Sequence, residues 1–157
     1  MVRARRGRPA VILTDVNVLV YAFRREAPAH RRYAEWLTGI VDGADELAMH
    51  EVPLAGFVRI VTSSRIFARP TPGAEAVRFV ERLVAAPRSR WLAGSDATWA
   101  TWATFSEIVR NDAAVSGNLV PDALLASLAL AHGCQLATAD RGFARYPGLA
   151  WFDPAHA

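Results

Sequence analysis

The sequence contains one cysteine, Cys134, in 157 residues, and this excludes an internal disulfide. A lone thiol fits a reducing cytoplasm, and its apolar neighbours at an expected helix end predict a buried, unreactive side chain. Uncharged apolar runs are all far shorter than the roughly 20 residues that span a bilayer, so we expect no membrane span. The N-terminus lacks both a full apolar stretch and a small-residue cleavage site, so we expect no signal peptide.

Several catalytic signatures are missing as well. There is no glycine-rich phosphate loop, and nothing supports a Ser–His–Asp or a Cys–His arrangement. The four histidines, which show no zinc-ligand spacing with each other or with cysteine, are His30, His50, His132 and His156. Hydrophobic residues make up 52% of the chain and charged residues 21%, so we expect one globular domain rather than a disordered chain.

Positive charge is unevenly distributed, although the formal net charge is only +3. Arginines cluster before the first apolar run and recur further on: Arg3, Arg5, Arg6 and Arg8, then Arg24, Arg25, Arg31 and Arg32, then Arg88 and Arg90, and finally Arg141 and Arg145. Such clusters suit a polyanionic substrate or an acidic partner, but they equally suit a solvated surface, so charge alone leaves both open. We expect residues 1–9 to form a basic, mobile N-terminal arm and residues 10–157 to form a single domain.

Short apolar runs alternate with amphipathic stretches, which predicts an α/β fold with a central, mainly parallel sheet. The expected strands cover residues 10–14, 47–49, 90–93, 135–139 and 149–152. The expected helices cover residues 28–41, 53–61, 71–86, 96–111 and 121–132. On the fourth helix, Trp99, Trp102 and Phe105 form an aromatic stripe. Such a stripe could stack nucleobases, but at helical spacing it more often belongs to a core or a dimer contact, and we favour that interpretation.

Aspartates follow two of the expected strands directly. Asp15 comes after the first strand and Asp140 after the strand that begins at residue 135. Ligands of open parallel sheets bind at the carboxyl ends of the strands, so these two acids can converge. Asp122 lies in the first turn of the helix after Pro121, whose N-terminus could lie at that edge of the sheet or at the opposite one.

Each of these acids also has a purely structural interpretation. Asp15 could cap a turn, Asp122 could interact with the helix dipole, and Asp140 could initiate the turn before Arg141. Together, however, three carboxylates at one site repel one another unless a cation compensates. Carboxylates and water are typical Mg²⁺ ligands, and such a site suits hydrolysis of phosphodiesters.

Three segments resemble the PIN-domain family, and in particular its VapC-type toxins of type II toxin–antitoxin systems. They are TDVNVLVYAF at residues 14–23, GFVRIVTSSRIF at residues 56–67, and GNLVPDALLASLALAHGCQLATADRGFARYPGLAW at residues 117–151. The segments occur in the expected order along nearly the whole chain. A PDA-helix and a TAD-x-x-F-A segment about eighteen residues apart make the set specific.

The resemblance implies a three-layer α/β/α fold and an endoribonuclease that depends on Mg²⁺ or Mn²⁺. It also implies inhibition by a cognate antitoxin, a homodimer, and a place in the cytoplasm of a bacterium or archaeon. Carried over by position, Asp15, Asp122 and Asp140 match the metal-binding and catalytic acids of the family. Asn17 and Thr138 match small polar groups that support the site.

The chain departs from the family pattern in two places. Many PIN domains carry a glutamate where this chain has Gly56, and often an acid where it has Gly142, which leaves open whether one or two metal ions bind. Glu51 lies five residues before Gly56, and it could substitute for the missing glutamate only if the chain is not yet helical there. Arg59 follows Gly56 on the same helix, where it could face the substrate or make a structural ion pair.

These departures keep a second function open, in which a catalytically degenerate PIN fold binds a protein or RNA without cutting. A phosphohydrolase of another α/β type is a weaker alternative, because Asn17 stands where that class has a second aspartate. The RNA target cannot be read from the sequence, since a metal site recognises phosphate rather than base identity.

Overall fold

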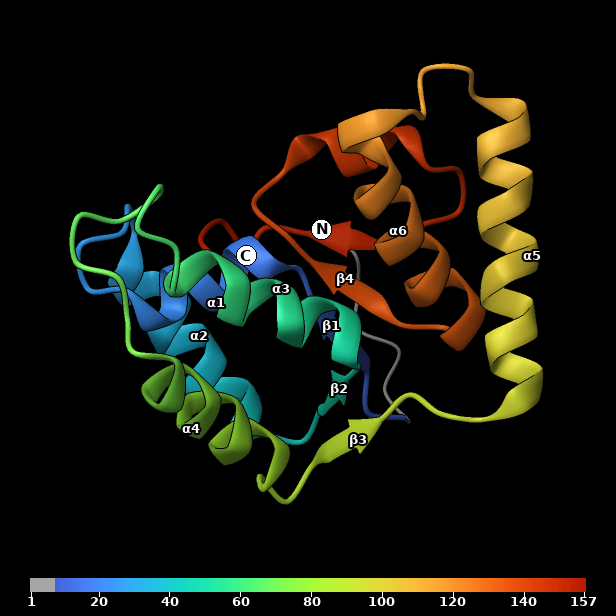
Figure 1. The fold of residues 1–157 in the computed structure, drawn as a ribbon. Coiled ribbons are helices and arrows are strands. Elements are labelled where there is room, and N and C mark those ends of the chain that lie inside the picture. The colour runs from blue at the N-terminus through green and yellow to red at the C-terminus, as the bar shows by residue number, and fades with distance from the viewer. Residues whose placement is uncertain (1–7) are drawn as a thin grey trace.

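Five parallel strands form one sheet at the centre of the protein (Figure 1). The computed structural model describes residues 8–157, apart from the side chain of Ser95. The strands are β1 (Val11–Thr14), β2 (Glu46–Met49), β3 (Ser89–Trp91), β4 (Gln135–Ala137) and β5 (Trp151–Phe152). Their order in the sheet is β3-β2-β1-β4-β5, and each neighbouring pair is parallel.

Within residues 8–157, six α-helices cover the two faces of this sheet. They are α1 (Val16–Phe23), α2 (His30–Asp42), α3 (Glu51–Val61), α4 (Gly73–Val84), α5 (Ser95–Asn111) and α6 (Val120–His132), with short 3-10 turns η1 (Gly117–Leu119) and η2 (Arg141–Arg145). Helices α1 to α4 lie on one side of the sheet, whereas α5 and α6 pack together on the other (Figure 1). The predicted three-layer α/β/α fold with a parallel sheet is confirmed. No helix in the described part of the chain is both long enough and apolar enough to cross a membrane.

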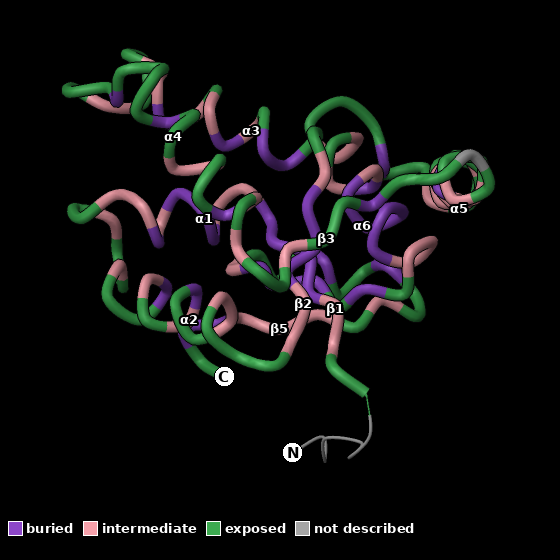
Figure 2. The backbone as a smooth tube through the Cα atoms, turned by 90° about the horizontal axis from the view of Figure 1, so that it is seen from below, coloured by how far each residue is buried: buried purple, intermediate pink, exposed green. Residues whose placement is uncertain are grey.

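The core is divided in two by the sheet, as the alternation of side chains along a strand requires. In β2, Leu47 and Met49 join the cluster beneath α1 to α4, whereas Ala48 between them joins the cluster beneath α5 and α6. Buried backbone accordingly runs through the sheet and through the inner faces of the helices (Figure 2). Cys134 is buried as predicted, and burial raises the pKa of its thiol to about 11, so the thiol stays protonated.

Two features differ from the sequence prediction, and a third prediction lies largely outside the described residues. The sequence pattern predicts no helix over residues 16–23, yet these form α1, whose many buried positions leave little polar periodicity to detect. Trp99 and Trp102 are 70% and 56% exposed, so of the predicted core or dimer contact only Phe105 takes the core position, and the dimer contact stays a prediction for the two tryptophans. Of the predicted N-terminal arm at residues 1–9, residues 1–7 lie outside the described part of the chain.

The sheet has its topological switch point between β1 and β4. From β1 the chain proceeds through β2 to β3 at one edge, and it then crosses over to β4 and β5 on the other side of β1. Thr14 pairs with Ala137 at the carboxyl ends of these strands, and the backbone N–H of Asp15 donates to the carbonyl of Ala137 over 2.9 Å. Crevices at such switch points are the usual ligand sites of open α/β sheets.

Candidate active site

The predicted acids Asp15, Asp122 and Asp140 all line one cleft of about 740 Å³. The cleft lies at the carboxyl edge of the sheet, and α1, α3, the start of α6 and the segment after α3 form its walls. The structure therefore brings together three side chains that are up to 125 positions apart in the sequence.

Asp15 is the most deeply buried of the three acids, with 8% of its surface exposed. It caps the N-terminus of α1, where Oδ1 accepts a hydrogen bond from the Val16 N–H over 2.7 Å. Its other oxygen, Oδ2, accepts from the hydroxyl of Thr138 over 2.7 Å. Burial raises the pKa of Asp15, these hydrogen bonds oppose the shift, and the charge of Asp140 adds to it. The net result is a carboxyl whose pKa lies above its ordinary value.

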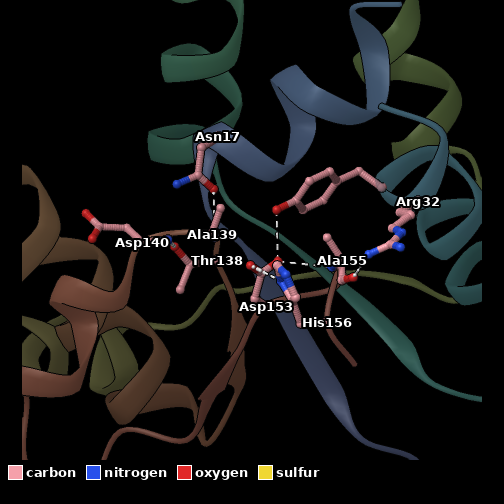
Figure 3. A network of polar contacts seen from close by, with 9 residues as sticks. Asn17, Arg32, Thr138, Ala139, Asp140, Asp153, Ala155 and His156 are labelled. Carbon is pink, nitrogen blue, oxygen red and sulfur yellow. Dashed lines mark hydrogen bonds and ion pairs between the residues drawn. The ribbon is translucent and has the colours of Figure 1, made fainter. Parts of the chain in front are cut away.

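Thr138 connects Asp15 to Asp140. Its fully buried hydroxyl donates to Asp15 and also accepts from the backbone N–H of Asp140 over 3.0 Å. Asn17 supports the same segment from α1, because its side-chain oxygen accepts from the Ala139 N–H over 3.3 Å (Figure 3). Asn17 itself lines the cleft. The two polar residues that sequence analysis assigned a supporting role therefore fix the end of β4 against the start of α1.

Asp140 lies at the exposed rim of the cleft, where the chain leaves β4. It caps the turn η2, because its Oδ1 accepts from the Gly142 N–H over 2.7 Å. The turn-forming role that the sequence left open is thus present, and it coexists with a place in the cleft.

The sequence left open at which edge of the sheet α6 begins, and the position of Asp122 in the cleft shows that it begins at the carboxyl edge. A helix that leads into a parallel strand runs back across the sheet, so α6 begins at the carboxyl edge and brings Asp122 into the cleft. Burial, together with the charges of Asp15 and Asp140, raises the pKa of Asp122 from 3.8 to about 6. Among residues 8–157, no hydrogen bond reaches this carboxylate.

Arg59 and Glu51, the remaining candidates, lie in different places. Arg59 lines the cleft from α3 and is exposed. Glu51 is the first residue of α3 and is also exposed, but it lines a smaller pocket of about 270 Å³ between α3, α5 and α6. The chain is thus already helical at Glu51, which removes the condition under which it could substitute for the glutamate missing at Gly56.

The cleft also has an apolar part, and the sequence analysis did not predict that its residues line the site. It is lined by Val20 and Tyr21 of α1, Ile60 of α3, and Ile66 and Phe67 of the following segment. The signal was present in the GFVRIVTSSRIF segment, but nothing in its periodicity distinguishes a wall of a cleft from an ordinary loop.

The donor set of the acidic part fits a hard divalent cation. Carboxylate oxygens are the ligands that Mg²⁺ prefers. Burial and the charges of Asp15 and Asp140 raise the pKa of Asp122, and a cation would relieve both the desolvation and the repulsion of its charged form. Within the described residues, no three acidic, histidine or cysteine side chains lie close enough together to enclose an ion directly. Mg²⁺ does not require such a cage, because it keeps several waters and commonly contacts one or two carboxylates.

The sheet and its acidic cleft define an open α/β protein with a ligand site at its switch point. The sequence profile of the PIN domain family matches residues 12–149, and the chain belongs to this family. The resemblance found in the sequence is thereby confirmed. Among curated relatives, Ribonuclease VapC43 of Mycobacterium tuberculosis is 35% identical over 144 residues, which cover 92% of this chain and 95% of the relative. Ribonuclease VapC31 of the same species is 33% identical, with coverage of 92% and 99%.

Solved structures share the fold at lower identity. A chain in the structure of VapBC2 from Rickettsia felis bound to a promoter DNA fragment has a TM-score of 0.65 and 19% identity, and the match covers 91% of this chain and 98% of that one. A chain in the structure of FitAcB from Neisseria gonorrhoeae has a TM-score of 0.60 and 22% identity, with coverage of 93% and 99%. These structures support the three-layer architecture.

Proposed function

We propose that this protein is a Mg²⁺-dependent endoribonuclease that acts as the toxin of a VapBC-type toxin–antitoxin pair. The observation that carries the proposal is the gathering of Asp15, Asp122 and Asp140 in one cleft at the switch point of the sheet. The relatives named VapC ribonucleases, which match more than nine-tenths of the chain, supply the reaction class.

The residues of the cleft would have three roles: metal binding, positioning of the acids, and binding of the phosphate backbone. Asp15, Asp122 and Asp140 would hold Mg²⁺, with Mn²⁺ as a substitute. When bound, the ion would neutralise charge on the phosphodiester and activate a water. Thr138 donates a hydrogen bond to Asp15, and Asn17 accepts one from the Ala139 N–H beside Asp140, so both would hold the acids in position. Arg59 lines the same cleft and offers a planar, permanently charged group to the phosphate backbone.

The decisive experiment measures RNA cleavage as Mn²⁺ or Mg²⁺ is titrated into purified protein, with and without chelator. We expect cleavage by the wild type that the chelator abolishes, and loss of at least about a hundredfold in Asp15→Asn, because removing one charge from the acid set weakens cation binding. The matched control is Asp42→Asn, which changes an exposed acid at the end of α2 and should cleave like the wild type. Undiminished cleavage by Asp15→Asn contradicts the proposal.

Gly56 and Gly142 support a second candidate function, in which the fold binds RNA or protein without cutting. Both occupy positions where the family often has acids, so the site has fewer carboxylates than many PIN domains. The same titration distinguishes the two functions. RNA binding without cleavage, over a broad panel of RNA and at saturating Mn²⁺, would favour the degenerate fold.

We further propose a cognate antitoxin and a homodimer as the partners of this chain in the cytoplasm. The antitoxin proposal is supported by the similar fold of chains in the solved structures of VapBC2 from Rickettsia felis and VapBC from Salmonella typhimurium. The homodimer is supported by Trp99 and Trp102, because large apolar side chains this exposed often mark contacts with another chain. Sedimentation of the wild type and of a Trp99→Ala, Trp102→Ala variant tests the homodimer, which we expect the double substitution to weaken.

A further inference from the structure

The apolar part of the cleft is continuous with its acidic part. Helix α1 links the two, since Asp15 caps its first turn and Tyr21 lies near its end, about 9 Å further along the helix axis at 1.5 Å per residue. Both residues line the same cleft. A nucleic acid with a phosphate at the acids can therefore reach this apolar part with a neighbouring unit.

The outer wall of the apolar part comes from the segment between α3 and α4. Ile66 and Phe67 line the cleft from this segment, and Ile66 is 52% exposed. The segment turns back at Ser63, whose carbonyl accepts from the N–H groups of Ile66 and Phe67 over 3.2 and 3.0 Å. Its far end is tied to α3, because the Thr71 N–H donates to the carbonyl of Val61 over 2.8 Å. The wall is thus an ordered turn that presents apolar side chains to solvent.

Arg24, just after α1, holds this turn by three separate contacts. Its Nη1 donates to Thr71 Oγ1 over 2.8 Å, its Nη2 donates to the carbonyl of Arg69 over 3.0 Å, and its guanidinium lies 4.1 Å from the ring centre of Phe67. The Arg24 side chain is only 12% exposed and also pairs with Glu26. A planar guanidinium with several donors is suited to such a clamp, because it satisfies two acceptors and stacks on an aromatic ring at once.

A nucleobase suits this surface better than a charged or purely aliphatic group. It has a flat apolar face for the side chains of Ile66, Phe67 and Tyr21, while its backbone phosphates remain near Arg59 and the acids. Stacking of this kind tolerates any base, so it contributes affinity without a fixed sequence. We propose that Ile66 and Phe67, positioned by Arg24, form the subsite that binds the nucleobase next to the phosphate held at the acids. This inference rests on the proposed ribonuclease function.

The test compares kinetic constants on a short RNA for the wild type, Ile66→Ser, Arg24→Ala and Arg24→Lys, with Arg25→Ala as the control. Arg25 is the exposed neighbour of Arg24 in sequence. Ile66→Ser should raise KM at least about fivefold with kcat little changed, because the lost apolar contact with the base removes binding shared by ground and transition states. Arg24→Ala should raise KM by a similar factor and Arg24→Lys by a smaller one. The control Arg25→Ala should have the KM of the wild type.

An RNA that lacks one base identifies the occupant of the subsite. With the wild type, removal of the base next to the cleaved phosphate should raise KM about as much as Ile66→Ser does. In the Ile66→Ser variant, removal of the same base should raise KM only slightly further, because the contact between the base and the side chain at position 66 is already lost. Since Ile66 is half exposed, this variant should fold normally, and denaturation in urea together with Mn²⁺ binding checks that it does.

Several outcomes would overturn the inference. If the wild type cleaves RNA but KM is unchanged in Ile66→Ser and Arg24→Ala, the subsite is wrong while the nuclease function stands. If Ile66→Ser weakens binding of the antitoxin but not of RNA, the wall belongs to the protein partner. If the wild type cleaves no RNA at any Mn²⁺ concentration, the function and the subsite fall together.

Discussion

The hydroxyl of Thr138 donates to the carboxylate of Asp15 over 2.7 Å, although the two residues are 123 positions apart. Both groups are buried, and the same hydroxyl accepts from the Asp140 N–H. Hydrogen bonds to a charged group are strongest where water is excluded. The carboxylate at the floor of the cleft is therefore held in one orientation by the protein itself, before any ligand binds.

Replacement of Thr138 by valine should destabilise the protein. The change keeps the shape of the side chain but leaves Oδ2 of Asp15 buried without its donor, at an expected cost of about 1.5–3 kcal/mol in the free energy of unfolding. Urea denaturation at neutral pH measures this. Thr138→Ser keeps the hydroxyl, so its free energy of unfolding should fall by less. It should also retain more RNA cleavage than the valine variant. Equal stability of Thr138→Val and the wild type would mean that Asp15 does not depend on this bond.

Asp122 should make the metal-free protein less stable as the pH rises. Because its pKa is raised from 3.8 to about 6, the folded chain retains a proton that the unfolded chain has released over this interval. The contribution to stability is fully present below pH 3.8 and is lost as the pH rises through about 6. We expect Asp122→Asn, measured in chelator, to be more stable than the wild type near neutral pH and to approach it in acid.

The difference in the free energy of unfolding between the wild type and Asp122→Asn reports on the Asp122 carboxyl alone, because the other titrating groups are common to both proteins. Burial lowers the pKa of His132, which opposes the trend in a similar pH range, but His132 is present in both proteins and cancels. Added Mg²⁺ should stabilise the wild type more than Asp122→Asn at neutral pH, because the ion relieves the same repulsion. A stability difference that does not vary with pH would show that the pKa of Asp122 is not raised in the folded protein.

The pattern of the sequence was sufficient to predict an α/β fold with a parallel sheet and the common edge of Asp15 and Asp140, while the three layers followed from the resemblance to the family. The strand-end positions of Asp15 and Asp140 depend only on where apolar runs stop, and parallel strands bring such ends to one edge. The place of Asp122 could not be derived in the same way, because it depends on which edge α6 starts from. That edge is set by the crossover connection and not by the composition of the helix.

Other features depend on tertiary contacts that leave no periodic signal. Helix α1 was missed because Val18, Leu19 and Val20 are all buried, so its sequence resembles a strand. The exposure of Trp99 and Trp102 was missed because helical spacing shows that side chains share a face, but not whether another element covers that face. The clamp by Arg24 depends on a loop that starts nearly forty residues later in the chain.

Asp153 connects the C-terminal segment to α2 through side-chain hydrogen bonds. Its Oδ1 accepts from the hydroxyl of Tyr33 over 2.8 Å and from the Ala155 N–H over 3.0 Å, and its Oδ2 lies 2.9 Å from Nδ1 of His156 (Figure 3). Burial alone would raise the pKa of Asp153, but these hydrogen bonds hold it below its ordinary value of 3.8. Arg32 of α2 adds a bond to the Ala155 carbonyl over 3.1 Å.

Tyr33→Phe should therefore cost about 1 kcal/mol in the free energy of unfolding at neutral pH, since it removes one donor from a partly solvated carboxylate. The stabilisation of a carboxyl with a lowered pKa is present above the unfolded value and is lost as the pH falls through the folded one. The difference from the wild type should accordingly shrink below about pH 4, which thermal unfolding at a series of pH values can measure. A difference that grows in acid would contradict this assignment.

Gly56 is required by the close approach of α3 to α1, and this explains why the chain has no acid there. A Cβ placed on Gly56 would lie 2.7 Å from Cγ2 of Val16, closer than the two atoms can approach. Gly56→Ala should destabilise the protein by about 1–3 kcal/mol through overpacking. The control is Gly39→Ala in α2, where nothing lies within 4 Å and the change should stabilise the helix by about 0.5–1 kcal/mol.

A double variant separates this clash from any general intolerance of α3. Val16→Ala removes the methyl group that Gly56→Ala would meet, so the two changes together should cost less than the sum of the single changes. Strict additivity in urea denaturation would show that the helices are not in contact at this point. With the contact present, a glutamate at position 56 would force α1 and α3 apart and widen the cleft that they line. The missing acid is then a consequence of tight packing at the wall of the site, and restoring it should weaken RNA cleavage unless Val16 is reduced to alanine as well.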